Sequence, residues 1–573
     1  MTDAHLAQSQ SSRRFTNAWV IAFAGAGLEI VQWAGARPLW LDEEMIALNL
    51  RDRGLVDLAG RLWLDQSAPF GWLALQRCAL LMLGTGERAL RLVPVLFGLG
   101  TLATAVWIGR RWLRPLGAAV LVLLSAFGQW ISFYVLELKH YSSDIFWSLL
   151  LPALAVWATE APAGEPDAGR AAGAAFRRAS VWWLVAAVAQ WFSNGALLVM
   201  PACALALIAA AWRRGDWRVA MRAAAPGLLW VALFGLHYVS ALRYTVGSDA
   251  LQGYWSFALP PAAAGIGGTL TWLARQLAPF AIKPGGATLW VPFWIAVVAG
   301  IALLIRDRFA LALVIGLIPL SAFALAAFRV APLFERLSLW VVPALYLAVA
   351  TSADEGVALL RTRWAQRRWI GVGLAAIAAT VGVGVSIDLV VQGFYDLQIN
   401  RPRSSNHDLN DREALQWLTS LRQPNDGLVT THLGLPAVWW YGGVPISGPY
   451  LGGGYQHDGG RVFEIEYLSS GLICGPGALR DQIGTPRPPR VLVYFGFRFD
   501  DVPANFDDKA LDDLRGLGSI VADRQFEGAS RAVIVDLRLP PDRPGIPGHA
   551  DSSPSGAPAS SRGCVAIEPA HRW

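Results

Sequence analysis

The amino-acid sequence predicts a polytopic α-helical membrane protein, with about 11 spans and a C-terminal extracytoplasmic α/β domain. Apolar residues make up 54% of the 573 residues, charged residues only 16%, and the mean hydropathy is +0.40. A soluble domain has about 25% charged residues, so this chain has too few charges to cover a soluble body of its size. Its 27 tryptophans also fit a membrane protein, because tryptophan gathers at lipid–water interfaces.

The first 395 residues contain apolar segments of the length that crosses a bilayer, roughly 17–25 residues. They lie near 17–36, 91–109, 115–133, 142–159, 179–194, 195–212, 223–241, 287–305, 309–328, 337–352 and 369–391. The first segment has the flanks of a signal peptide, but the many later spans favour an uncleaved anchor. Two further apolar stretches, 68–84 and 266–280, are interpreted as helices that lie in or dip into the outer interface.

The distribution of Lys and Arg predicts the orientation, because cytoplasmic loops carry an excess of both. With the N-terminus in the cytoplasm, the inner segments hold 18 basic residues and the short outer loops hold six. A span at 68–84 would instead turn Arg110, Arg111 and Arg114 outward. The net charge of +6 does not indicate a nucleic-acid partner, because the arginines lie between apolar segments and form no basic face.

The composition changes near residue 395, which predicts a membrane-embedded domain at 1–395, a periplasmic α/β domain at 396–540 and a disordered tail at 541–573. In the second domain, Asn410 caps a helix that runs to about residue 422, and a further helix is expected near 508–517. Strands are expected at 428–431, 490–495 and 531–535. Cys474 and Cys564 both fall outside the membrane, and whether they form a disulfide is left open.

Three groups of polar residues fall on the predicted outer face. Their members are Asp42, Glu43 and Glu44 after the first span; Glu137, Lys139, His140, Tyr141 and Asp144 between two spans; and Arg336 at the mouth of a later span. Each has a simpler interpretation. The first group can be solvated acids at a helix start, the second a solvated hairpin with a Glu137–Lys139 pair, and Arg336 an interfacial anchor.

Together the three groups indicate glycosyl transfer from a lipid-phosphate sugar. The donor phosphate lies at the membrane interface, where a carboxylate can accept the proton of the acceptor hydroxyl. A guanidinium group matches phosphate with two parallel hydrogen bonds and stabilises it as it leaves. Both kinds of group are expected on one face of the membrane.

Six short motifs follow one another in a specific order over residues 15–350. They are Leu41-Asp42-Glu43, Pro69 at the start of an apolar segment, Glu87 to Leu92, Gly109-Arg110-Arg111, Tyr141-Ser142-Ser143-Asp144, and Glu335-Arg336-Leu337 before Val342-Pro343. In order and spacing they resemble the GT-C fold membrane glycosyltransferases, specifically family 39 and the bacterial aminoarabinose- and galacturonosyltransferase-like group.

The resemblance implies Asp42 as the catalytic base, Asp144 as the second acidic site residue and Arg336 as a phosphate ligand. Further substrate-binding residues are expected among Glu43, Glu137, Lys139, His140, Tyr141 and Lys283. The aminoarabinose transferases have Glu-Lys before the proline that matches Pro69, whereas this chain has Ser67-Ala68. Lys139 or Lys283 is therefore expected to replace that phosphate-binding lysine.

The resemblance also implies the reaction and its location. An inverting glycosyltransferase would move a sugar from a polyprenyl-phosphate donor to an envelope lipid, glycan or protein at the periplasmic face of a bacterial inner membrane. No cofactor is expected, and a divalent cation at the acidic site is left open. Two alternatives stay open: an O-antigen ligase or polymerase type of enzyme, and a lipid or solute transporter, which needs polar residues at mid-membrane.

Overall fold

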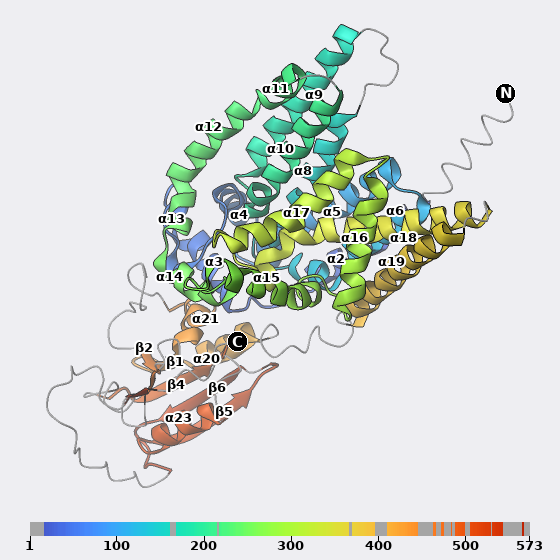
Figure 1. The fold of residues 1–573 in the computed structure, drawn as a ribbon. Coiled ribbons are helices and arrows are strands. Elements are labelled where there is room, and N and C mark those ends of the chain that lie inside the picture. The colour runs from blue at the N-terminus through green and yellow to red at the C-terminus, as the bar shows by residue number, and fades with distance from the viewer. Residues whose placement is uncertain are drawn as a thin grey trace. The chain divides into compact units, whose positions relative to one another are not determined.

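The computed structural model describes residues 16–160, 168–214, 217–365, 369–395, 409–444, 462–465, 472–474, 483, 487–498, 505–528, 530–542 and 564–566. The chain forms two compact units. The first consists of Met1–Ala36, Gly54–Arg61 and Ser67–Gln398, and the second of Arg37–Arg53, Leu62–Gln66 and Ile399–Trp573. The first is helical, and the second contains the β-sheets (Figure 1).

Each of the eleven apolar segments predicted to span the membrane coincides with helical structure in the first unit. Its helices are α2 (Thr16–Ala34), α4 (Phe70–Leu83), α5 (Glu87–Trp112), α6 (Pro115–Phe127), α7 (Gln129–Tyr134), α8 (Tyr141–Thr159), α9 (Ala168–Ala189), α10 (Asn194–Arg214), α11 (Trp217–Ala224), α12 (Gly227–His237), α13 (Arg243–Val246), α14 (Asp249–Tyr254), α15 (Gly265–Ile282), α16 (Trp290–Leu304), α17 (Phe309–Ala327), α18 (Val342–Ala365) and α19 (Trp369–Tyr395). Among the described residues, seven helices are long and apolar enough to cross a membrane. The chain is therefore a multi-pass helical membrane protein.

Two helices are suited to the interface by their length or composition. Helix α4 has 14 residues and is about 21 Å long at 1.5 Å per residue, which is shorter than the roughly 30 Å hydrocarbon core. Helix α15 has 18 residues, but it does not reach the apolar composition of the seven candidate spans. Both properties agree with the interfacial interpretation of 68–84 and 266–280, which stays a prediction.

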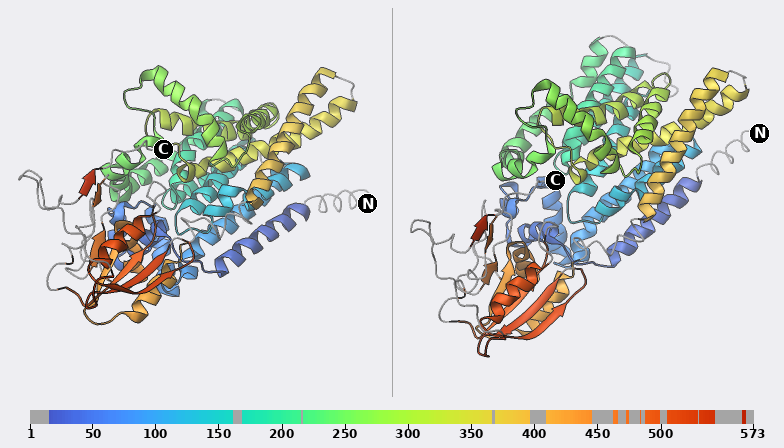
Figure 2. Two further views of the ribbon diagram at one scale, coloured as in Figure 1. Left: turned by 90° about the horizontal axis from the view of Figure 1, so that it is seen from below. Right: turned by 60° about the horizontal axis from the view of Figure 1, so that its bottom comes forward.

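The N-terminal half of helix α18 is buried inside the first unit. Of the apolar window in Glu335–Trp364, 94% is buried inside the protein, whereas the window in Trp217–Val246 is only 17% buried. The first segment contains α18, which packs against α19, α16 and α6. The second contains α12, which runs along the edge of the unit (Figures 1 and 2).

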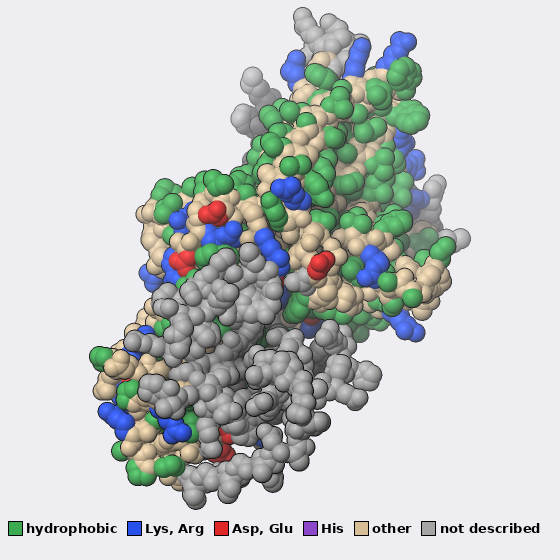
Figure 3. Space-filling model, turned by 90° about the vertical axis from the view of Figure 1, so that its left-hand side faces the viewer, with side chains coloured by type: hydrophobic (Ala, Val, Ile, Leu, Met, Phe, Trp, Pro, Cys, Tyr) green, Lys and Arg blue, Asp and Glu red, His purple; other side chains and the backbone are tan. Residues whose placement is uncertain are grey.

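Hydrophobic side chains also cover much of the outside of the first unit. Figure 3 shows them over one face, with Lys and Arg side chains at its upper end. The exposed residues include Leu228, Leu236, Leu320 and Leu374, each more than half accessible. Large apolar side chains at such positions fit contact with lipid better than contact with water.

The second unit is an α/β domain around a five-stranded sheet with the order β2-β1-β4-β6-β5. Strands β2 (Val462–Ile465), β1 (Gly427–Thr431) and β4 (Arg490–Phe495) are parallel, whereas β6 (Arg531–Asp536) is antiparallel to β4 and to β5 (Ser519–Gln525). The helices are α20 (Asp411–Leu421), α21 (Leu435–Trp440) and α23 (Phe506–Arg515). Each predicted strand and helix of this domain is present, while β2, β5 and α21 were not predicted.

A short second sheet joins β3 (Leu472–Cys474) to β7 (Cys564–Ala566) in antiparallel register, in which Cys474 is opposite Cys564. Of the tail predicted to be disordered, the structure describes residues 541 and 542 and strand β7. The rest of that tail lies outside the described residues.

The first outer loop contributes helix α3 (Leu41–Asp52) to the second unit, although the sequence analysis assigned it to the membrane domain. Apolar contacts explain this placement, because Leu41, Met45 and Leu48 belong to the same buried cluster as the sheet residues. The Trp63 and Trp439 rings stack with their centroids 5.5 Å apart. The predicted base Asp42 is therefore carried by the second unit.

Candidate functional site

The three acids at the start of α3 have different environments. Glu43 is buried, accepts a hydrogen bond from the Trp40 backbone N–H at 3.3 Å and lies 3.9 Å from an Arg37 guanidinium nitrogen. These contacts make Glu43 a cap of its own helix. Glu44 is also buried, whereas the side chain of Asp42 keeps part of its surface accessible. Of the three, Asp42 is thus the one that can meet a substrate without first leaving the core.

Glu44 forms a buried carboxyl pair with Asp411 at the start of α20. Burial is the main cause that raises the pKa of Glu44 well above its usual value, with further contributions from the charges of Asp411 and Glu43. The pKa of Asp411 is raised to about 6 by burial, although a hydrogen bond from Ser530 Oγ at 2.7 Å opposes this. The buried hydroxyl of Tyr494 belongs to the same cluster as Glu44, Asp411 and Ser530. Burial of the two carboxyl groups thus raises the pKa of both, and more strongly that of Glu44.

We expect the stability of the second unit to fall as the pH rises from 5 to 8. The raised pKa values mean that Glu44 and Asp411 bind protons more tightly in the folded chain than in the unfolded chain. Their contribution is complete below the unfolded pKa values near 4 and is lost as the pH rises through the folded values, at about 1.4 kcal/mol per pH unit and group. The measurement is thermal proteolysis of purified protein across this pH range, followed at peptides from 409–444.

The variant Glu44→Gln removes one titrating group and should flatten this pH profile. The matched control is Glu413→Gln on α20, because the Glu413 side chain is 53% exposed and pairs with Arg524 at 3.3 Å. This control should follow the wild-type profile. A wild-type midpoint that stays constant from pH 5 to 8 would contradict the raised pKa values of this buried pair.

The second predicted group lies in the turn between α7 and α8 in the first unit. Glu137, Lys139, His140 and Tyr141 are all buried, and the turn is closed by a hydrogen bond from the Lys139 backbone N–H to the Glu137 carbonyl at 2.7 Å. The alternative of a solvated hairpin is therefore wrong. A buried lysine beside a buried glutamate at a helix mouth is costly without a role or compensating partners.

Asp144, in the first turn of α8, is held by the turn that precedes α10. Its Oδ1 accepts hydrogen bonds from Ser193 Oγ at 2.6 Å and from the Gly195 backbone N–H at 2.9 Å. His140 Nε2 lies 3.5 Å from Oδ2, and the Asn194 side-chain nitrogen lies 3.3 Å from the same ring nitrogen. The carboxylate thus caps the N-terminus of α10, where the helix dipole favours negative charge.

The neighbourhood of Asp144 leaves little room for a substrate. A side chain at Gly195 would place its Cβ 2.7 Å from Trp340 Cβ and 3.1 Å from Asp144 Cβ. Burial lowers the pKa of His140 to about 3, with a smaller contribution from the Lys139 charge, so its imidazole is neutral. These contacts favour a positioning role for Asp144, which holds α8 and α10 together under the α7–α8 turn.

Arg336 lies in the 3₁₀ helix η5 (Glu335–Val341), which leads directly into α18. This short helix packs against α7, α8 and α10, so Arg336 approaches the α7–α8 turn. The charges of Arg336, Glu137 and Glu335 all act on the Tyr134 hydroxyl, a buried group that the sequence analysis missed. The structure therefore brings the second and third predicted groups together around Tyr134.

Lys283 joins the same region from the loop after α15. Its ammonium nitrogen lies 3.1 Å from Glu335 Oε1, and its side chain is 58% exposed. The guanidinium of Arg336 lies over the ring of Trp255, with the central carbon 5.6 Å from the ring centroid. Lys283 thus pairs with Glu335, the residue before Arg336, at the mouth of α18, and Arg336 is half-buried.

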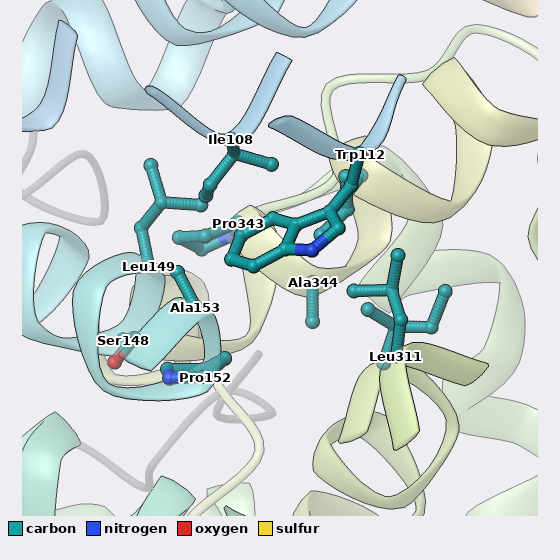
Figure 4. A pocket seen from close by; sticks show the side chains of 11 residues that line it. Ile108, Trp112, Ser148, Leu149, Pro152, Ala153, Leu311, Pro343 and Ala344 are labelled. Carbon is teal, nitrogen blue, oxygen red and sulfur yellow. The ribbon is translucent and has the colours of Figure 1, made fainter. Parts of the chain in front are cut away.

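A separate pocket between helices α5, α8, α17 and α18 contains none of the predicted site residues. Its lining is apolar apart from Ser148 and the edge of an indole ring, as Figure 4 shows. The residues are Ile108, Trp112, Ser148, Leu149, Pro152, Ala153, Leu311, Ile315, Pro343, Ala344 and Leu347. Such a surface offers no charged partner to a phosphate. Over the described part of the chain, no group of three or more His, Cys, Asp or Glu side chains is arranged to hold a metal ion.

Ser193, Asn194 and Trp255 were also missed by the sequence analysis. Ser193-Asn194-Gly195 before an apolar segment carries the signal of a helix start, and Ser193 Oγ does accept from the Ala196 backbone N–H at 2.9 Å. No local signal connects these residues to Asp144, which lies about 50 positions earlier in the chain.

The fold and the polar cluster define a class of protein: a multi-pass helical membrane protein with cationic side chains at a helix mouth and an α/β domain after the last membrane helix. Comparison with solved structures makes this class more specific. The chain has the GT-C fold of membrane glycosyltransferases. It matches the structure of ArnT from Cupriavidus metallidurans bound to undecaprenyl phosphate with a TM-score of 0.50 and 14% identity, over 91% of this chain and 98% of that chain.

An apo structure of the oligosaccharyltransferase from Archaeoglobus fulgidus is also similar, with a TM-score of 0.46 and 12% identity over 84% of this chain and 69% of that chain. No protein-family model matches the sequence, and no curated protein matches it. At these identities the likeness concerns the fold, so the resemblance in fold predicted from the motifs is confirmed and the reaction is not.

Proposed function

We propose that the chain is a glycosyltransferase that uses a polyprenyl-phosphate sugar as donor. The observation that carries the proposal is the cluster of Arg336, Lys283 and Glu335 beside the buried α7–α8 turn, at the mouth of helix α18 in a GT-C fold. A guanidinium at a helix mouth can bind an interfacial phosphate monoester with paired hydrogen bonds. The ArnT structure, bound to undecaprenyl phosphate, gives an independent precedent for such a ligand on this fold.

In the proposed reaction, a hydroxyl of the acceptor attacks the anomeric carbon of the sugar. A new C–O bond forms there as the bond between this carbon and the phosphate oxygen breaks. Asp42 accepts the proton of the attacking hydroxyl, and the polyprenyl phosphate leaves with the electron pair of the broken bond. Attack from the side opposite the phosphate inverts the configuration at this carbon.

The remaining residues have supporting roles in this proposal. Arg336 stabilises the negative charge that grows on the leaving phosphate, and Lys283 or Lys139 adds a second positive charge. Glu137, His140 and Tyr141 shape the floor of the site, while Asp144 keeps α8 and α10 in place. Glu43 caps α3 and thereby supports Asp42. No step of this proposal requires a cofactor.

Transfer by purified protein in detergent tests the proposal. The full chain should move labelled sugar from at least one synthetic polyprenyl-phosphate donor to an acceptor fraction extracted from the envelope. Mass spectrometry of envelope lipids, glycans and proteins from a deletion strain should reveal the product that is lost and so identify the acceptor. Failure to use any monophosphate donor, together with use of a diphosphate-linked glycan, would favour the ligase type of enzyme.

The proposed orientation places the cluster and the second unit in the periplasm of a bacterial cell. Its support is the excess of Lys and Arg in the alternate loops. A reporter enzyme that is active only in the periplasm should therefore be active when fused at residue 400 and silent when fused at residue 112. Activity at residue 112 would overturn the orientation, because it would turn the α5–α6 connection and its arginines outward.

A further inference from the structure

An aromatic surface lies directly against Arg336 in the first unit. It consists of Tyr254, Trp255, Phe257 and Phe334 and is called the aromatic shelf below. Trp255 contacts Phe334 with centroids 5.4 Å apart, and Phe257 contacts Phe334 at 5.2 Å. Tyr254 is 55% exposed and Phe257 is 40% exposed. The rings thus pack on one another and still present an open apolar face.

The aromatic shelf is fixed to the segment that carries Arg336. The Leu333 backbone N–H donates to the Ala258 carbonyl at 3.0 Å, and the Arg329 side chain donates to the Pro260 carbonyl. Further along, the Phe334 backbone N–H donates to Ser338 Oγ at 3.1 Å. The shelf and the guanidinium therefore form one preorganised surface, which lowers the entropy lost when a ligand binds.

We propose that the aromatic shelf binds the first isoprene units of the donor lipid next to the phosphate. This inference rests on the proposed function, which assigns the phosphate to Arg336. The first isoprene unit is bonded to that phosphate, so it must lie beside whatever side chain holds it, and the Trp255 ring is an apolar surface in contact with the Arg336 guanidinium. Unsaturated, methyl-branched chains gain dispersion contacts on aromatic faces.

The shelf gives the site a way to recognise a prenyl chain that is independent of chain length. The distal isoprene units of a long polyprenyl chain would remain in the bilayer and add membrane affinity only. The phosphate-proximal units would be bound by the protein itself. A short prenyl phosphate should therefore capture most of the specific affinity.

The experiment is equilibrium dialysis of radiolabelled geranyl phosphate, a ten-carbon prenyl phosphate, against the purified full chain in detergent, with a detergent-only control. We expect wild-type protein to bind it at least about tenfold more tightly than inorganic phosphate, and we expect Trp255→Ala to lose about tenfold in affinity for it. Phe257→Ala removes an exposed ring with little risk to folding and should lose about threefold.

The matched control is Trp212→Ala, because Trp212 is 64% exposed and lies in the last turn of α10. It should bind geranyl phosphate as the wild type does. Inorganic phosphate binding should be unchanged by Phe257→Ala, whose ring packs on Phe334, and this separates the shelf from Arg336. Wild-type affinity for geranyl phosphate in both shelf variants would overturn the inference. Displacement of the radiolabelled probe by phosphatidic acid as readily as by unlabelled geranyl phosphate would also overturn it, because the rings would then be a general lipid interface.

These outcomes are distinguishable from failure of the proposed function. Shelf-dependent binding of geranyl phosphate by a protein that transfers no sugar would support the shelf and contradict the transferase. Sugar transfer by shelf variants that bind geranyl phosphate as tightly as the wild type would support the transferase and contradict the shelf.

Discussion

Replacement of Asp42 by Asn should lower the turnover of sugar transfer by about 10²–10⁴-fold, the usual effect of losing a general base. Asn has nearly the size and shape of Asp but cannot accept the proton of the attacking hydroxyl. Asp42 lies in the first turn of α3, and its partly accessible side chain distinguishes it from the buried Glu43 and Glu44. The measurement is the rate of transfer by purified variants at saturating donor, beside donor affinity, which should be unchanged.

Two variants on the same helix serve as controls. Asp52→Asn alters a carboxylate at the other end of α3, where it pairs with Arg51 at 2.7 Å, and should keep wild-type turnover. Glu43→Gln weakens a helix cap and should cost less than Asp42→Asn. Turnover of Asp42→Asn within about threefold of wild type would contradict the mechanism and leave Asp42 as an acid that stabilises a helix start.

The membrane part of the fold could be predicted because its signals are local. An apolar segment such as 309–328 must be a helix if it enters lipid, since each backbone group then needs a partner within the segment. Helix α17 is present at Phe309–Ala327 for this reason. The segment predicted at 115–133 is instead two helices, because the chain turns at Gly128, where a Cβ would lie 2.5 Å from the Leu124 carbonyl.

The division of the chain into units could not be predicted, because it depends on contacts between distant residues. The Leu39 backbone N–H donates to the Tyr441 hydroxyl at 2.8 Å, and Arg51 lies over the Trp440 ring at 4.8 Å. Neither contact can be recognised from the periodicity of apolar residues along the sequence. An outer loop of mixed composition therefore looked like part of the membrane domain, although it completes the core of the second unit.

The sequence predicted which residues come together in the candidate site better than it predicted the role of each residue. The sequence analysis selected Glu137, His140 and Arg336, which the structure brings to one region of the first unit. It assigned Asp144 to catalysis, and that role remains a prediction. The hydrogen bonds from Ser193 and Gly195 suit a residue that positions helices, and an acid near a membrane helix end looks the same in sequence whether it acts on a substrate or caps a neighbouring helix.

Replacement of Arg336 by Ala should weaken donor use by about 10²–10³-fold in kcat/KM, as expected for the loss of a side chain that stabilises developing negative charge. Arg336→Lys keeps the charge but loses the planar pair of donors, so its activity should lie between those of Arg336→Ala and the wild type. The measurement is kcat/KM for the donor with the purified full chain.

The control for Arg336 should be an arginine with a similar aromatic contact at another position in the protein. Arg243 also lies over an aromatic ring, that of Tyr244 at 4.8 Å, and is one of the six basic residues that the sequence analysis counts in the short outer loops. Arg243→Ala should therefore retain wild-type kcat/KM. An interfacial anchor would act through burial of its aliphatic stem, and Lys would replace it with little loss. A phosphate ligand would not tolerate Lys in this way. Full activity of both Arg336 variants would therefore identify Arg336 as an anchor and would leave Lys283 and Lys139 as the remaining candidates for the phosphate.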